Sequence, residues 1–262
     1  CMIITLLSDL GTRDGSVAAA KAVLIRHAPQ CSLVDISHHI AHYDVQQAAY
    51  LLLSSYRHFP AGTIHVAMVD IFGGEKQSIL LAEHDGYYFI APDNGLLQRL
   101  LGNDTGNVRR CFEVKKNCSF NEWIDNAAKI TTAIGQGISA SFPLYEMKPA
   151  VRTLNLQSMP QGIDCNILYA DRYENVVLDI TKAEFNELVG DRPFRIKIMR
   201  MQDITTISNN YNDVKQGEPL CRFNSTGYLE IAVNHGKAAT LLGLDLKNTG
   251  SLRYKTIRIF LR

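Results

Sequence analysis

The sequence predicts an α/β protein of two domains. We expect an N-terminal α/β domain with a mostly parallel central sheet, followed by a smaller C-terminal antiparallel β-barrel-like domain. In the first half of the 262-residue chain, apolar runs of strand length alternate with segments of helical periodicity. Past about Leu156 the pattern changes to short β-like runs separated by turn signals. The stretch PAVRTLNLQSMPQG between them has the character of a linker, so the predicted domains are residues 1–152 and 160–262.

The expected elements of the first domain follow one another as strand and helix. The strand runs are MIITLLSD, CSLVDIS and TIHVAMVD, then a hairpin in SILLAEHDGYYFIAPD with its turn at Asp85-Gly86. The helical segments are SVAAAKAVLIRHAP, ended by Pro29, DVQQAAYLLLSSYRHFP, capped by Asp44 and ended by Pro60, NGLLQRLLG, and WIDNAAKITTAIGQG. Such alternation implies a largely parallel sheet that is covered on both faces.

The second domain is expected to consist mainly of short strands. The β-like runs are DCNILYADRYENVVLDI, FRIKIMRM, EPLCRFN, YLEIAVN and LRYKTIRIFL, and TKAEFNELVG is the only clear helix. Short strands separated by turns are typical of a small antiparallel sandwich or barrel.

Composition and charge limit the classes of partner. Hydrophobic residues make up 46% and charged residues 20% of the chain, an ordinary globular balance. The formal net charge of +1 gives no electrostatic reason to expect nucleic acid or an anionic membrane as partner. No apolar run approaches the roughly 20 residues that span a bilayer, and no secretory signal is visible. The six cysteines lack a CxxC pair, so we expect free thiols and a cytoplasmic location.

Aspartates accompany four of the predicted strands of the first domain. They are Asp9, Asp35, Asp70 and Asp93. Because a parallel sheet places equivalent strand ends along one edge, we expect these carboxylates to converge on one cleft. Like charges crowded there would cost stability without a polar or cationic ligand, so the pattern indicates a binding site.

The glycine-bearing turn SDLGTRDGS indicates the kind of ligand. There is no GxGxxG after the first strand and no GxxxxGK[ST] anywhere, so dinucleotides and nucleoside triphosphates lack their phosphate cradles. An aspartate such as Asp9 is suited to accept hydrogen bonds from a ribose diol, which points to a nucleoside without a phosphate chain. The alternative is that Asp9 and Asp14 only cap the following helix and fix the turn.

A histidine cluster raises the question of a metal ion. His38, His39 and His42 lie in SHHIAHYD. His39 and His42 would share a face only in a helix, and Ile40 with Tyr43 suggests an irregular connection instead. We therefore expect no metal cofactor.

Several motifs together resemble the S-adenosylmethionine (SAM) hydroxide adenosyltransferase family, whose relatives include fluorinases and chlorinases. The matching stretches are SDLGTRDGSVAAAKAVL, LVDISHHIAHYDVQQAAYLL, FPAGTIHVAMVD, APDNGLL, ADRYENVVLDI and STGYLEIAVNHGKAA. The resemblance implies attack on SAM at ribose C5′, by water in the hydrolases and by halide in the halogenases, with methionine leaving. It also implies a homotrimer with ligand sites at subunit interfaces and no cofactor beyond SAM as substrate or ligand.

The resemblance assigns three ligand contacts to the first domain. Asp9 looks like the residue that holds the ribose hydroxyls, Ser16 like a methionine-end contact, and Tyr43 like the aromatic that packs against the sugar. Ser16 could instead cap its helix, and Tyr43 could be an ordinary core aromatic.

Further ligand contacts are implied in the second domain. Asp171 and Asn175 match the pair that grips the methionine amino group and ribose, and Tyr211 falls where an aromatic stacks on adenine. Asn234 and His235 lie where backbone groups meet the adenine edge. Asn175 could instead serve a turn, and Tyr211 could belong to a core.

The residues that handle water in the family's hydrolases are only partly retained. Asp70 matches the aspartate of an Asp-Arg-His trio, but Gln77 stands at the arginine position with Lys76 beside it, and Asn121 stands at the histidine position. The side-chain amides of Gln77 and Asn121 do not accept a proton near neutral pH, so Asp70 is the remaining proton acceptor. Thr226 also replaces an arginine that binds the ligand carboxylate in halogenating relatives.

Two functions remain open at this point. The first is a divergent SAM hydrolase that produces adenosine and methionine, with Asp70 as base or water-orienting residue. The second is a non-catalytic protein that binds adenosine or SAM on the same scaffold, because the ligand contacts are better retained than the water-handling ones. Halogenation is disfavoured because the DIFGG loop does not resemble a halide pocket.

Overall fold

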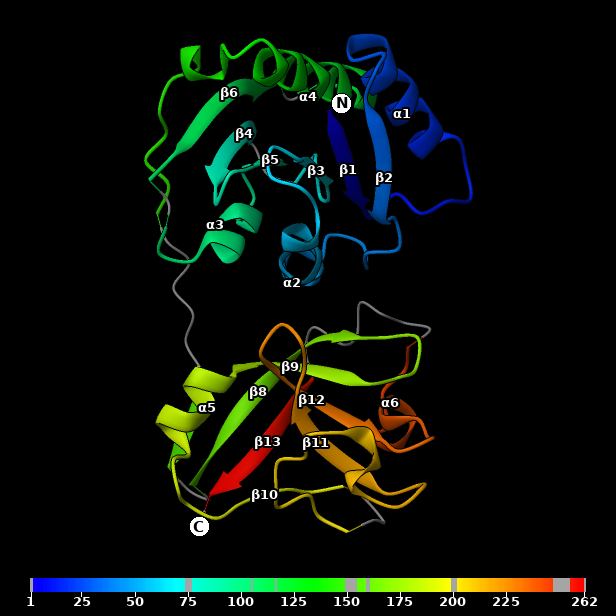
Figure 1. Ribbon diagram of the computed structural model, residues 1–262, viewed down its shortest axis with the longest axis vertical. Coiled ribbons are helices and arrows are strands. Elements are labelled where there is room, and N and C mark those ends of the chain that lie inside the picture. The colour runs from blue at the N-terminus through cyan, green and yellow to red at the C-terminus, as the bar shows by residue number, and fades with distance from the viewer. Residues whose placement is uncertain are drawn as a thin grey trace. The chain divides into compact units, whose positions relative to one another are not determined.

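The chain divides into two compact units, Cys1–Val151 and Arg152–Arg262, each with its own sheet. The computed structural model in Figure 1 describes residues 2–73, 77–104, 106–115, 117–148, 155–158, 161–198, 202–246 and 255–261. The predicted fold class is confirmed, because a mostly parallel sheet with helices is followed by an all-antiparallel one.

The six-stranded sheet of the first unit has the order β2-β1-β3-β5-β4-β6. Its strands are Ile3–Ser8 (β1), Ser32–Ser37 (β2), Ile64–Met68 (β3), Gln77–His84 (β4), Tyr87–Pro92 (β5) and Val108–Val114 (β6). Strands β1, β2, β3 and β5 are parallel, whereas β4 is antiparallel to both β5 and β6. The predicted hairpin turn is confirmed, since Asp85 and Gly86 both have positive φ, 51° and 80°, as a two-residue hairpin requires.

Helices cover both faces of this sheet (Figure 1). The helices α1 (Ser16–His27) and α4 (Phe120–Gly135) pack together on one face, and α2 (Val45–Ser55) and α3 (Leu96–Leu101) on the other. Strand residues alternate between these two cores: Ile4 and Leu6 belong to the first and Leu7 to the second. The burial of both sheet faces explains why the strands read as continuous apolar runs.

Helix α2 ends earlier than its sequence pattern predicts. The periodicity runs to Pro60, but the α-helix stops at Ser55 and a single 3₁₀ turn, Tyr56–His58, follows. The hydroxyls of Ser54 and Ser55 donate to the carbonyl of Leu51 one turn back. Such side-chain bonds compete with the helical ladder, and helices often tighten to 3₁₀ geometry at their ends.

The second unit is built from antiparallel strands in the order β10-β13-β8-β9-β12-β11, with β7 paired to β8. Its strands are Asn155–Ser158 (β7), Gln161–Ala170 (β8), Val176–Thr181 (β9), Phe194–Ile196 (β10), Pro219–Phe223 (β11), Tyr228–Val233 (β12) and Thr256–Leu261 (β13). The predicted helix is α5 (Lys182–Leu188), whose start is fixed by a capping box between Thr181 and Glu184. A second helix, α6 (Ala238–Leu241), was not predicted because four residues are too few to show helical periodicity.

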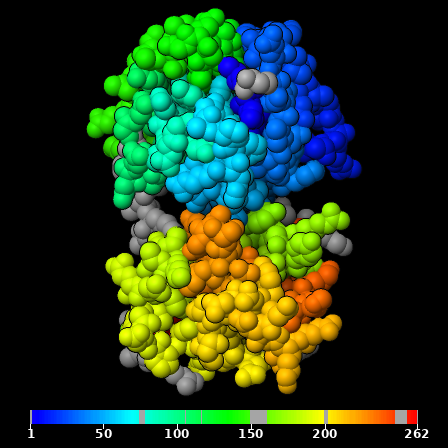
Figure 2. Space-filling view, in the orientation of Figure 1, coloured from blue at the N-terminus to red at the C-terminus, as the bar shows by residue number. Residues whose placement is uncertain are grey.

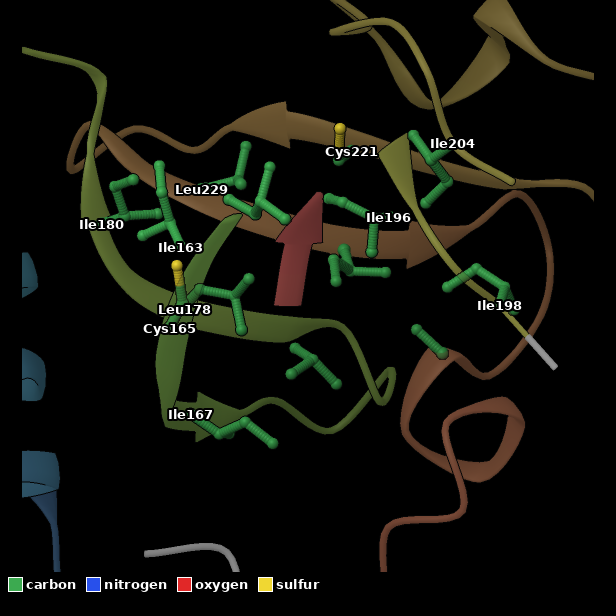
Figure 3. Packing of buried hydrophobic residues seen from close by; sticks show 14 of the residues in the cluster. Ile163, Cys165, Ile167, Leu178, Ile180, Ile196, Ile198, Ile204, Cys221 and Leu229 are labelled. Atoms are coloured by element: carbon green, nitrogen blue, oxygen red, sulfur yellow. The ribbon is translucent and has the colours of Figure 1, made fainter. Parts of the chain in front are cut away.

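The core of the second unit lies on the inner side of its curled sheet (Figure 3). Aliphatic side chains and two cysteines from different strands point toward one another there, among them Ile163, Cys165, Leu178, Ile196 and Cys221. The cysteines of the described residues are free thiols. In the described part of the chain, no helix has the length and apolar character needed to cross a membrane.

A buried histidine lies in the sheet of the first unit. His65, on β3, is fully buried, and Nδ1 lies 2.7 Å from the hydroxyl of Thr5 on β1. Its ring is stacked on Phe89 at 5.1 Å between centroids. Further rings surround it, those of Tyr56, Phe59 and Tyr87. Burial lowers the pKa of His65 to about 4, because this site solvates a charged imidazole poorly.

We predict that His65 makes the first unit acid-sensitive. Below pH 6.5 the unfolded chain takes up a proton that the folded chain excludes until its pKa of about 4, so stability falls as pH falls through this window. The loss is about 3 kcal/mol in the free energy of unfolding. Urea unfolding followed by fluorescence of the single, buried Trp123 measures it.

The matched variants separate His65 from other titrating groups. His65→Gln removes the titration and keeps an acceptor for Thr5, so its unfolding free energy should depend less on pH between 6.5 and 4. His39 is exposed, so His39→Gln should retain the wild-type pH dependence. Equal pH dependence in His65→Gln and the wild-type protein would contradict the prediction.

Candidate active site

The carboxyl ends of β1, β3 and β5 lie at one edge of the first sheet. Asp9 directly follows β1, Asp70 comes two residues after β3, and Asp93 directly follows β5. Because β4 runs in the opposite direction, its first residue lies at this same edge, where Gln77 pairs with Val114 of β6. The topology therefore brings Asp9, Asp70, Asp93 and the start of β4 to one edge of the sheet.

Asp9 joins the loops that follow β2 and β3. Its Oδ2 accepts hydrogen bonds from the backbone N–H of Tyr43, at 3.0 Å, and of Asp70, at 3.3 Å. Both residues have left-handed backbone conformations, with φ of 62° and 50°. Such conformations cost on the order of 1 kcal/mol each for residues other than glycine. The two bonds to the Asp9 carboxylate offset this cost and fix both loops.

The Asp70 carboxylate lies against the backbone of Gly73. A Cβ atom added at Gly73 would lie 2.3 Å from Oδ2 and 2.4 Å from Oδ1 of Asp70. The N–H of Gly73 also donates to the carbonyl of Asp70 at 3.2 Å, which closes a tight turn. Only glycine leaves room for the carboxylate in this position. The sequence reasoning missed Gly73, although the paired glycines of DIFGG were a signal for it.

The other two aspartates have structural partners. Asp35 lies inside β2, opposite Leu6, and not after the end of its strand as Asp9, Asp70 and Asp93 do. Its carboxylate lies 2.6 Å from Nζ of Lys21 and 3.1 Å from Nε2 of His38. Asp93 accepts a hydrogen bond of 2.8 Å from the hydroxyl of Tyr145. Among the four predicted aspartates, Asp9 and Asp70 are joined to each other by the hydrogen bond from the N–H of Asp70 to the Asp9 carboxylate.

His38 supports the turn that carries Asp9. Nε2 of His38 lies 3.1 Å from Oδ1 of Asp35, and Nδ1 lies within hydrogen-bond distance, 2.7 Å, of the Ser8 hydroxyl oxygen. The carbonyl of His38 also accepts from the N–H of Gly11 at 2.7 Å. Among the described residues, no group of three or more His, Cys, Asp or Glu side chains is arranged to hold a metal ion. His38 is therefore occupied in holding β1 and its turn.

Ser16 and Tyr43 occupy different environments. Ser16 is the first residue of α1, and its N–H donates to Oδ1 of Asp14 at 2.9 Å, a bond that lowers the pKa of Asp14. The N-cap of α1 is Gly15 and no side chain caps this helix, so the predictions that Asp14 or Ser16 caps it are wrong, and the Asp14 carboxylate fixes the turn before the helix. Tyr43 is 63% exposed, so the alternative that it is a core aromatic is wrong.

The three residues expected beside Asp70 are only partly described. Lys76 and the side chain of Gln77 lie outside the described residues, and Gln77 is placed only as the first residue of β4. Asn121 lies exposed in the first turn of α4, whose N-cap is Ser119.

In the second unit, Asp171 and Asn175 close the turn between β8 and β9. Oδ1 of Asp171 accepts from the N–H of Asn175 at 2.8 Å, and Oδ2 accepts from its Nδ2 at 3.0 Å. Asn175 therefore serves the turn, as the alternative predicted, and places the Asp171 carboxylate at the turn. Glu174, with φ of 63°, ties this turn to α6 through Lys237, at 2.9 Å, and the hydroxyl of Thr240, at 2.6 Å.

Tyr211 lies over the outer face of the second sheet. Its hydroxyl donates to Oε1 of Glu230 at 2.7 Å, and the guanidinium of Arg222 lies 4.7 Å from its ring centroid. Burial and the Glu230 carboxylate raise the pKa of Tyr211 to about 12, and burial raises the pKa of Glu230. Tyr211 keeps 38% of its surface exposed and is not a core aromatic. The sequence reasoning missed Glu230, although a charge in the middle of YLEIAVN was a signal.

The segment after β12 holds the remaining candidates. Asn234 is buried, and its Nδ2 donates to the carbonyl of Val214 at 2.8 Å. His235 is exposed and has φ of 53°. The hydroxyl of Thr226 donates to Asn224 at 2.7 Å within the turn between β11 and β12. In Figure 2 the residues from about 205 to 235, yellow to orange, adjoin one another on the visible face of this unit.

Comparison with known proteins decides the family. The SAM hydroxide adenosyltransferase N-terminal domain matches residues 4–138, and the C-terminal domain of the same family matches residues 165–249. The chain belongs to the SAM hydroxide adenosyltransferase family. The resemblance inferred from the motifs is confirmed.

Relatives of known name span both units. The (R)-S-adenosyl-L-methionine hydrolase of Salinispora tropica is 30% identical over 257 residues, covering 92% of this chain and 94% of that protein. A fluorinase of Actinoplanes sp. is 30% identical over 275 residues, covering 88% and 91%. A solved structure described as an uncharacterized conserved protein from Thermotoga maritima matches with a TM-score of 0.75 and 25% identity, covering 98% of this chain and 99% of that one.

We predict that the Asp9 carboxylate stabilises this family fold. Asp9→Ala removes the acceptor of two backbone N–H groups, so the free energy of unfolding of the first unit should fall by about 2 kcal/mol. Asp9→Asn keeps an acceptor oxygen and should lose less than half of that. Urea unfolding followed by Trp123 fluorescence compares them, and equal stability of the two variants would contradict the prediction.

Proposed function

We propose that this protein is a divergent SAM hydrolase that converts SAM and water to adenosine and L-methionine. The observation that carries the proposal is the pair of hydrogen bonds by which Asp9 holds the backbone of Tyr43 and Asp70. These bonds bring Asp9, Tyr43 and Asp70 to one edge of the sheet. They are the candidates for binding the ribose hydroxyls, packing against the sugar and accepting a proton from water. Family membership and relatives named (R)-S-adenosyl-L-methionine hydrolase supply the substrate class.

The ligand contacts are assigned as the family resemblance implies. Since the backbone bonds fall on Oδ2 of Asp9, we assign Oδ1 to the ribose diol. Exposed Tyr43 packs against the sugar, and Ser16 contacts the methionine end. No cofactor is required, because the positively charged sulfonium is itself a good leaving group.

From the second unit we assign the remaining contacts. Asp171 and Asn175 bind the methionine amino group and ribose, Tyr211 stacks on adenine, and backbone groups of Asn234 and His235 meet the adenine edge. Asp171 is suited to a cationic amino group because its turn is already closed by Asn175. We also propose that the chain forms the homotrimer implied by its family, with ligand at subunit interfaces.

The reaction is a displacement at the ribose C5′ carbon. The water oxygen forms a bond to C5′ while the C5′–S bond breaks, and the electron pair of that bond neutralises the sulfonium to the thioether of methionine. The proton lost by water passes to the Asp70 carboxylate. The protein's contribution is to hold this water in line and to limit its other partners.

The residues beside Asp70 supply hydrogen bonds and not proton acceptors. The amides of Gln77 and Asn121 can orient a water molecule, but neither is basic near neutral pH. Lys76 is the candidate for the missing cation of the family trio, as a point charge in place of a planar guanidinium.

One specific observation favours a second function. The arginine and histidine of the family's water-handling trio are replaced by Gln77 and Asn121, while the ligand contacts are retained. A protein that binds adenosine or SAM without turnover would show this pattern.

We predict that Asp70→Asn abolishes the release of adenosine from SAM and leaves the affinity for SAM within about threefold. Asparagine tolerates the left-handed conformation at this position, so the backbone and its bond to Asp9 are preserved. Chromatography measures adenosine and methionine, and calorimetry measures binding. Binding by the wild-type protein without adenosine after a long incubation would decide for the non-catalytic alternative. Full activity of Asp70→Asn would remove Asp70 from the mechanism.

We further predict that Asp9→Ala weakens binding of SAM and of adenosine, because the ribose diol loses its acceptor. The expected loss is about tenfold or more for hydrogen bonds to a charged group. Unchanged affinity would contradict the assignment of Asp9 to the ribose.

We also predict that Gly73→Ala lowers the rate of adenosine release at least tenfold. The added methyl group would occupy the space of the Asp70 carboxylate and move it, and a small displacement of a reacting group costs rate steeply. Gly106→Ala is the matched control, since a Cβ there meets nothing within 4 Å. Wild-type rates for Gly73→Ala would show that the position of Asp70 is not critical.

A further inference from the structure

The second unit contains a buried carboxylate that none of the assigned contacts uses. Glu230, in the middle of β12, is only 6% exposed. Its neighbours Leu229 and Ile231 point into the core of this unit, so Glu230 points to the opposite, outer face of the sheet. Burial there raises the pKa of Glu230. Because a desolvated carboxylate is costly, it requires a partner that compensates for the lost water.

The partner comes from a loop and not from the sheet. Tyr211 donates its hydroxyl to Oε1 of Glu230 at 2.7 Å. On the neighbouring strand β11, directly opposite Glu230 in the register, Arg222 places its guanidinium 4.7 Å from the centroid of the Tyr211 ring. A cation over an aromatic face is attracted by the ring electrons. Glu230 on β12 thus fixes the hydroxyl of Tyr211, and Arg222 on the neighbouring strand β11 fixes its ring.

The backbone of Tyr211 is fixed as well. It opens a 3₁₀ turn, Tyr211–Asp213, and Oδ2 of Asp213 accepts from the N–H groups of Asn209 at 2.7 Å and Asn210 at 3.0 Å. Rotation about the side-chain bonds of Tyr211 is therefore the freedom that remains, and Glu230 with Arg222 removes it.

The sheet register relates the residue that holds the ring to β8, the strand that leads to Asp171. Asp171 acts electrostatically on both Tyr211 and Glu230. Tyr169, two residues before Asp171 on β8, lies opposite Val177 of β9, which in turn lies opposite Glu230. Tyr211 still exposes 38% of its surface after these contacts. A flat, partly exposed ring is therefore held by a residue two strands from β8, whose end leads into the turn with Asp171.

We propose that Glu230 is a positioning residue that orients the ring of Tyr211 for stacking on the purine base, with Arg222 supporting the ring. This inference rests on the proposed function for the identity of the ligand. A ring that is already oriented loses less conformational freedom when the base binds, which strengthens binding without a new contact to the ligand.

The test compares variants of the full chain by calorimetric titration with adenosine. Glu230→Leu removes the acceptor and Tyr211→Phe removes the donor, so each should weaken binding about fivefold. The double variant should be no weaker than Glu230→Leu alone, because both changes break one interaction. Glu230→Gln keeps an acceptor oxygen and should bind within about twofold of the wild-type protein. Tyr211→Ala, which removes the ring, should lose about 5- to 100-fold.

A matched control separates positioning from stability. Asp179 is another buried carboxylate of this sheet and binds the backbone and side chain of Asn166, both at 2.7 Å. Asp179→Asn should lower the melting temperature and leave the affinity for adenosine unchanged. If hydrolysis is measured as well, Glu230→Leu should raise KM and leave kcat unchanged.

The outcomes distinguish this inference from the proposed function. Wild-type affinity in both Glu230→Leu and Tyr211→Phe would overturn the positioning role while adenosine binding itself stands. Additive losses in the double variant, or a failure of Glu230→Gln to retain affinity, would also overturn it. If the wild-type protein binds neither adenosine nor SAM, the proposed function and this inference both fail.

Discussion

A single carboxylate oxygen organises the edge of the first sheet. Oδ2 of Asp9 accepts hydrogen bonds from the backbone N–H groups of Tyr43 and Asp70, which belong to the loops that follow β2 and β3, the two strands flanking β1. Both loop residues are left-handed, and neither is a glycine. Without this acceptor the two loops would relax independently. The relative placement of the candidate base and the candidate sugar contact thus depends on one side chain.

The two units use the same physical device. In each, a carboxylate on or just after a strand restrains a residue from a neighbouring loop: Asp9 acts on backbone groups, and Glu230 acts on the hydroxyl of Tyr211. The bonds to Asp9 fix the backbone from which the side chains of Tyr43 and Asp70 project. The bond to Glu230 fixes the hydroxyl at the end of the Tyr211 side chain. In both cases the conformational entropy of ordering these groups is lost when the protein folds and not when a ligand binds.

The sequence predicted the elements of the fold well because the signals were local. Alternating strands and helices, the Asp85-Gly86 turn and the Asp44 cap of α2 each depend on short-range chemistry. The site was harder, since its contacts join residues far apart in the chain. The pairing of Asp9 with Asp70 spans 61 positions, and no pattern distinguished it from the different role of Asp35 inside β2. Gly73 and Glu230 each carried a local signal, but the groups on which they act, the Asp70 carboxylate and the Tyr211 hydroxyl, are identified only by the folded structure.

The anchoring of Asp70 has a consequence for how this family can diversify. Its backbone N–H is bound by the Asp9 carboxylate, and its own carboxylate occupies space that a side chain at position 73 would fill. The residues that follow are not required to hold Asp70 through that bond. Substitutions in the segment after Gly73 can therefore change the chemical character of this sheet edge while the backbone bond between Asp70 and Asp9 is kept.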